Sequence, residues 1–205
     1  MSSLIAKDSG NTRIPPLEAG TYPAICNSVI DIGLQYSKAF NKENHQVMFM
    51  FEIPSETIEI DGETKSRMIS GTYTMSLSER SNLRKMLESW RSKAFTEEEL
   101  NGFDLEKVLG LPCLVTIINE TGKNGNSYSN ISNVSKMPKG FPAPEGREEP
   151  FLFDMGGKDW MVMLPSLPEW IQNRIRESST YKKLVGGAEE GTDEAPLPSD
   201  DDLPF

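Results

Sequence analysis

Apolar and polar residues alternate along the first third of the chain, as they do in strands that bury one face. Gly20 to Leu34 is rich in β-branched residues and predicts a long first strand with a kink near Gly33. A polar loop is expected over Gln35 to Asn44. The next strand, His45 to Ile53, places four apolar side chains on one face: Val47, Phe49, Phe51 and Ile53.

Turn residues indicate two hairpins. The Asp61-Gly62 dipeptide is typical of a tight turn and predicts a third strand that runs on to Tyr73. Two further strands, Leu111 to Asn119 and Ser127 to Met137, are joined by a loop rich in glycine and asparagine. The first three strands are therefore expected to form a meander, and the last two a separate hairpin.

The residues between these two groups of strands have helical spacing. Ser78 is an N-cap residue, and a helix from there to Arg91 would share one apolar face among Leu83, Leu87 and Trp90. Thr96 and Glu99 make a capping box, and one more turn is expected over Phe103 to Leu109. The order of elements is that of the OB-fold. The sequence therefore predicts a mainly β protein, a five-stranded OB-fold barrel with a helix between strands 3 and 4.

Apolar residues return after a segment rich in proline and glycine that begins at Met137. Phe151 to Phe153 and Trp160 to Leu164 are interpreted as two short strands, and Pro168 to Arg176 as a helix with Pro168 in its first turn. This region either forms a second contact surface or completes the core, and we favour packing on the barrel. The predicted units are a flexible arm (1–16), the OB-fold domain (17–137), a C-terminal β/α extension (138–185) and a disordered acidic tail (186–205).

The acidic residues are concentrated at the C-terminal end. The 205 residues carry a formal net charge of −10, from 31 Asp and Glu against 21 Lys and Arg. Residues 186–205 hold seven of those acids and none of the bases, so the other 185 residues hold 24 acids against 21 bases. A body that is nearly neutral can carry a basic groove, although the whole chain is acidic.

Neither a membrane segment nor a catalytic signature is found. The longest apolar runs, such as Val47 to Phe51, are far shorter than the ~20 residues of a membrane span, and a cytoplasmic location is expected. His45 has no nucleophile or metal ligand near it in sequence, and Gly122 to Gly125 lacks the spacing of a phosphate-binding loop. We expect no enzyme and no cofactor. Cys26 and Cys113 are expected to be buried free thiols.

Basic and aromatic residues are interleaved in several segments, as single-stranded nucleic acid requires for phosphate contacts and base stacking. In the third strand, Lys65, Arg67 and Tyr73 occupy alternate positions and would share a face with Ile69. For Phe40 and Tyr73, a place in the barrel core is the alternative to DNA contact. Phe49, Phe51 and Trp90 are assigned to that core. The candidate contacts are Tyr36, Lys38, Phe40, Lys42, Lys65, Arg67, Tyr73, Lys123, Tyr128 and Lys136.

The last six residues combine three carboxylates with an aromatic end. Asp200, Asp201 and Asp202 suit a basic rim, Pro204 keeps the backbone extended, and the ring of Phe205 suits an apolar pocket beyond Leu203. The pattern predicts a peptide that docks on other proteins. A solubilising acidic end is the alternative.

This ending closely resembles the acidic tip of bacterial single-stranded DNA-binding proteins, and the chain as a whole resembles phage-encoded proteins of that kind with an OB-fold. Two features depart from the resemblance: Leu203 stands where isoleucine is usual, and a minimal OB domain does not need residues 138–185. Besides the tail, the similar passages are Leu17 to Ile25, Val47 to Ile53, Leu111 to Ile117 with its glycine-rich hairpin, and Leu167 to Gln172.

The resemblance implies a protein that binds and protects single-stranded DNA during phage replication and recombination in a bacterial host cell. Its tail would recruit replication, repair or recombination proteins. A homo-oligomer stays open, because linked sites favour the coating of a long strand. Two other functions also stay open: an adaptor or inhibitor whose tail imitates nucleic acid at a host enzyme, and a nuclease or recombination enzyme with an OB domain.

Overall fold

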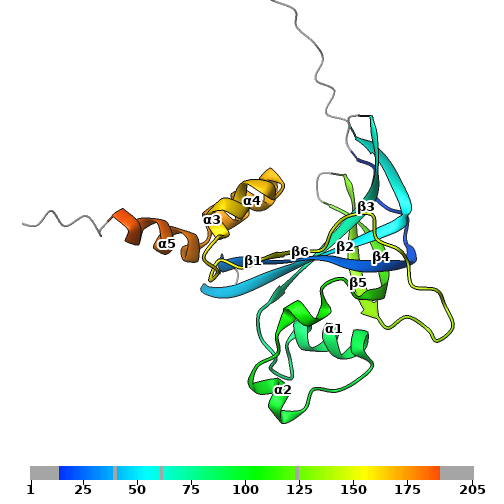
Figure 1. The fold of residues 1–205 in the computed structure, drawn as a ribbon, viewed down its shortest axis with the longest axis horizontal. Coiled ribbons are helices and arrows are strands. Elements are labelled where there is room, and N and C mark those ends of the chain that lie inside the picture. Colours follow the sequence, from blue (N-terminus) through cyan, green and yellow to red (C-terminus); the bar gives the residue numbers. More distant parts are fainter. Residues whose placement is uncertain (1–13, 39–40, 61, 123–124, 190–205) are drawn as a thin grey trace, which may run out of the picture.

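The computed structural model describes residues 14–38, 41–60, 62–122 and 125–189, and most of its strands form one curled, open half-barrel (Figure 1). Five antiparallel strands are arranged in the order β3-β2-β1-β4-β5. The mainly β class, the meander and the second hairpin are thereby confirmed. The strands are β1 (Gly20–Ser37), β2 (Lys42–Ile60), β3 (Glu63–Thr74), β4 (Pro112–Thr121) and β5 (Ser127–Ser135).

The first two strands are longer than the sequence predicts. Gln35 pairs with Asn44 and Ser37 with Lys42, so the predicted polar loop is wrong over most of its length. The polar residues there are compatible with a strand because none of their side chains is buried at this end of the hairpin.

The middle of strand β2, Val47 to Ile53, is largely buried on both faces and separates two cores. Its odd-numbered apolar residues lie inside the half-barrel as predicted, and Trp90 packs edge-on against Phe51 at 5.8 Å between ring centroids. Met48 points to the other face, where it joins Ile30 and Ile32 in a second core. Cys26 and Cys113 are buried, free thiols in the first core, which confirms that prediction.

Helices between β3 and β4 pack against the half-barrel core. Helix α1 (Asn82–Arg91) begins at Ser81, whose hydroxyl accepts a hydrogen bond from the Leu83 amide, and not at Ser78 as predicted. Ser78 instead bonds Ser76 within the preceding turn. The predicted capping box at Thr96 is confirmed at the start of α2 (Glu97–Asn101), and the predicted extra turn is a short 3-10 helix, η1 (Leu105–Val108).

The C-terminal extension packs against β1 and β2. Strand β6 (Phe151–Phe153) runs parallel to β1, but the strand predicted over Trp160 to Leu164 is wrong. Trp160 and Leu164 are buried four residues apart while the residues between them are more exposed, which is the period of a helix. The helices are α3 (Trp160–Met163), η2 (Leu164–Ser166), α4 (Glu169–Glu177) and α5 (Ser179–Glu189).

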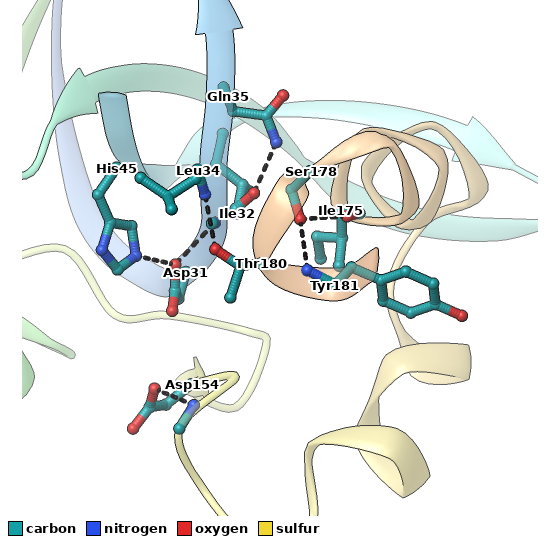
Figure 2. A network of polar contacts seen from close by, with 12 residues as sticks. Asp31, Ile32, Leu34, Gln35, His45, Asp154, Ile175, Ser178, Thr180 and Tyr181 are labelled. Atoms are coloured by element: carbon teal, nitrogen blue, oxygen red, sulfur yellow. Dashed lines mark hydrogen bonds and ion pairs between the residues drawn. The ribbon is translucent and has the colours of Figure 1, made fainter. Parts of the chain in front are cut away.

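A bend in β1 receives the junction between α4 and α5. Gly33 has a φ of +73°, and the ladder to β2 shifts its register beside it, as the predicted kink requires. Asp31 accepts hydrogen bonds from the Gly33 amide and from His45, at 2.8 and 2.6 Å (Figure 2). The next amide, of Leu34, donates to Thr180 at the start of α5 at 2.9 Å. The bend therefore joins the half-barrel to the extension.

A buried carboxylate anchors the segment that leads from β5 to β6. Glu52 is fully buried and accepts hydrogen bonds from the amides of Arg147 and Glu148 at 2.8 and 3.4 Å. Asn27 donates to the carbonyls of Glu148 and Glu149. These contacts hold the crossing segment against β1 and β2.

Candidate nucleic-acid interface

The outermost strands of the sheet, β3 and β5, curl until they touch, and three concavities lie along β3, two of them at this contact and one beside it. The first concavity lies between β2, β3 and the turn before α1. The second lies between β3, α1 and β5. The third lies between β3, β5 and residues 14–17. Their volumes are about 610, 350 and 280 Å³. We call them together the β3–β5 seam. Tyr73 and Asn82 line both the first and the second concavity, so these two adjoin each other.

The seam is lined by cations and neutral residues. No aspartate or glutamate is among the described residues that line the three concavities. The rest of the lining is mostly serine, threonine, asparagine and apolar groups. Lys42 and Arg80 line the first concavity, Lys85 the second and Arg67 the third. The described lining therefore carries four positive charges and no negative charge, which suits a polyanion.

A fourth concavity, of about 520 Å³, has the opposite character. It lies between β1, β2, β6 and the segment from α2 to η1, and its apolar wall carries four carboxylates. His45 is the one basic side chain among its described lining residues, and it is already hydrogen-bonded to Asp31. A polyanion is repelled there, so charge separates the two regions. The other three carboxylates are Asp104, Glu106 and Asp154.

Two tyrosines supply flat surfaces along the seam. The ring of Tyr73 packs edge-on against Phe49 at 5.8 Å, and burial raises the pKa of its hydroxyl to about 12. Tyr73 therefore forms a fixed wall between the first two concavities and belongs partly to the core. Tyr128 lines the third concavity and is 47% exposed. It is the more accessible ring for stacking.

The N-terminal segment helps to shape the third concavity. The Arg67 guanidinium donates a hydrogen bond to the carbonyl of Pro15 at 2.6 Å, and Ser129 donates to the carbonyl of Leu17 at 3.0 Å. Residues 15–17 thus bridge β3 and β5. The bridge holds Arg67 in place beside Tyr128.

Four of the residues proposed from sequence meet at the seam: Lys42, Arg67, Tyr73 and Tyr128. The predicted alternation of Arg67 with Ile69 and Tyr73 turns this face toward the core, because Ile69 is buried and Tyr73 packs on the same cluster. On that face Lys65 is exposed and Arg67 is half-buried, while Ile69 and Tyr73 pack on the core.

The other proposed contacts lie elsewhere. Tyr36 and Lys38 are exposed near the end of the β1–β2 hairpin, where the Tyr36 hydroxyl donates to Asn41. Lys65 forms an exposed ion pair with Glu63 at 3.3 Å, and Lys136 is exposed after β5. Phe40, Lys123 and the six residues from Asp200 to Phe205 lie outside the described residues.

Two cations of the seam were not proposed from sequence. Arg80 belongs to the turn before α1, and Lys85 lies on the exposed side of α1, away from the buried Leu83 and Leu87. The helical periodicity shows that Lys85 is on a polar face. It does not show that this face borders the contact between β3 and β5.

Within the described residues, no three histidine, cysteine or acidic side chains are grouped as a metal site requires. None of the described helices has the length and apolar character needed to cross a membrane. No protein-family model matches the chain, and a search of curated proteins finds no significant relative.

Proposed function

We propose that the protein binds single-stranded DNA along the β3–β5 seam, without strong base preference, as a single-stranded DNA-binding protein with an OB-like barrel. The observation that carries this proposal is the seam itself, a line of concavities with four cations and no acid in the described lining. The order of the strands, with helices between β3 and β4, is consistent with that fold.

Each lining residue has a role that its chemistry supports. Lys42, Arg80, Lys85 and Arg67 neutralise successive phosphates, while Tyr128 offers a face for base stacking. The asparagine, serine and threonine side chains hydrogen-bond sugars, phosphates or any base edge, which favours binding without sequence preference.

The biological setting is part of the same proposal. The chain acts during phage replication and recombination in the cytoplasm of a bacterial host, and its acidic tail recruits replication or repair proteins. The resemblance in sequence supports these statements. The tail lies outside the described residues.

Fluorescence anisotropy of labelled poly-dT, with a duplex of equal length as control, tests the DNA-binding proposal. The logarithm of the binding constant should fall with the logarithm of the salt concentration with a slope of about −0.7 for each neutralised phosphate, so four cations give about −3. The double variant Arg80→Ala with Lys85→Ala should reduce the magnitude of this slope by about 1.4.

A matched control removes two exposed lysines that line none of the three concavities, Lys158→Ala with Lys182→Ala. This control should keep most of the salt slope. If poly-dT does not bind, and the full chain still captures host replication proteins, the adaptor function is correct instead. Magnesium-dependent cleavage of the oligonucleotide would favour a nuclease.

A further inference from the structure

An arginine of the C-terminal extension reaches the edge of the seam. Arg174 on α4 is half-buried, and its guanidinium donates to Thr72 on β3 at 3.2 Å and to Gln46 on β2 at 3.0 Å. Both acceptors line the first concavity. No carboxylate pairs with Arg174 among the described residues. Its guanidinium is therefore held beside the seam by neutral acceptors.

The backbone of α4 is held at the same place. The Gln35 side chain donates to the Arg174 carbonyl at 3.0 Å, and Ile171 and Ile175 are buried in the second core. This helix is thus a rigid part of the structure and presents a fixed edge to β2 and β3. A contact site on it is already in position before a ligand arrives.

An exposed tryptophan lies one helical turn before Arg174. Trp170 and Arg174 are four residues apart in α4, which places them on the same side of the helix. Trp170 is 51% exposed, whereas Trp90 and Trp160 are 4% and 8% exposed. Each buried indole has a partner, since Trp90 donates to the Pro112 carbonyl and Trp160 packs against Tyr181. The described residues offer Trp170 no hydrogen bond or ring contact.

We propose that the DNA path continues from the first concavity onto α4, where Trp170 stacks on a base and Arg174 contacts a neighbouring phosphate. An indole face stacks on any base, and an arginine beside it adds the charge that the backbone requires. The extension then has a role that the half-barrel alone does not fulfil, because it lengthens the binding site. This inference rests on the proposed function.

Tryptophan fluorescence tests the inference directly, because the other two indoles are buried. Poly-dT should quench the emission of the wild-type protein, and Trp170→Phe should lose most of that quenching. Trp170→Ala should bind poly-dT about 5- to 150-fold more weakly by anisotropy. Arg174→Gln should reduce the magnitude of the salt slope by about 0.7.

Val162→Ala is the matched control, since Val162 is an apolar residue of α3 that is 81% exposed. It should leave both quenching and affinity unchanged. If poly-dT binds by anisotropy but Trp170→Ala binds equally well and no quenching occurs, the inference is overturned while the proposed function stands. If poly-dT does not bind at all, the proposed function fails and the inference with it. The inference is also overturned if the wild-type protein is an oligomer, Trp170→Ala is a monomer and poly-dT causes no quenching. In that case the indole belongs to a contact between copies.

Discussion

Replacing Gly33 with alanine tests whether the bend in β1 holds the C-terminal extension in place. Gly33 has a φ of +73°, where an L side chain is strained. A Cβ built there would lie 2.5 Å from Met155 Cε, 2.9 Å from Ser178 Oγ and 2.9 Å from Thr180 Cβ. The Met155 methyl group can rotate away. The Ser178 hydroxyl is held by hydrogen bonds to Ile175 and Tyr181, and the Thr180 Cβ is attached directly to the backbone, so neither atom moves easily.

Two terms give the expected loss of stability. The left-handed backbone costs about 1–2 kcal/mol for a residue with a Cβ. Forcing a methyl group into a packed junction costs about 1–3 kcal/mol more. Gly33→Ala should therefore lower the free energy of unfolding by about 2–5 kcal/mol. Because the clash lies at the junction of α4 and α5, the extension should become sensitive to protease first.

Urea unfolding followed by circular dichroism measures the loss, and limited proteolysis locates it. Gly62→Ala is the control, because Gly62 has a φ of +83° but would place its Cβ in open space. It should lose only the backbone term, about 1–2 kcal/mol. Equal losses in the two variants, or an extension in Gly33→Ala that resists protease as well as wild type, would refute the packing argument.

Three further predictions concern buried or paired groups. Glu52→Ala should cost about 1–3 kcal/mol, because the Arg147 amide loses its acceptor, and hydrogen exchange at that amide should accelerate. Burial raises the pKa of the Cys26 thiol to about 12 from an ordinary value of 9.0, so the folded state binds more protons than the unfolded state between these values. Stability should therefore fall as the pH rises from 9.0 toward 12, and Cys26→Ala should make this fall in the urea midpoints shallower; an equally steep fall in the variant would contradict the reasoning. The hydrogen bond from Arg84 lowers the pKa of Glu88, so the pair stabilises the fold above the ordinary pKa of 4.5. This contribution is lost as the pH falls below 4.5, and Arg84→Ala should weaken the loss in urea midpoints measured over the acid range.

Local patterns predicted most of the strands and one helix cap, and they failed where two signals were close together in sequence. Ser78 and Ser81 are both acceptable N-caps; in the structure Ser81 accepts from the Leu83 amide, whereas Ser78 bonds Ser76. The apolar run at Trp160 has the composition of a strand. It is helical because its two buried residues must both face the second core, which exists only after β1 and β2 have paired.

The linear order of residues established the alternation that buries Phe49 and Phe51, the capping box at Thr96 and the uneven distribution of charge, because each of these depends on neighbours within a few positions. The seam depends on distant parts of the chain. Lys42, Arg67, Lys85 and Tyr128 belong to four different elements, and they line one surface because the sheet curls until its two outermost strands touch. Curling is a collective result of twist and core packing, so no short stretch of sequence specifies which side chains it brings together.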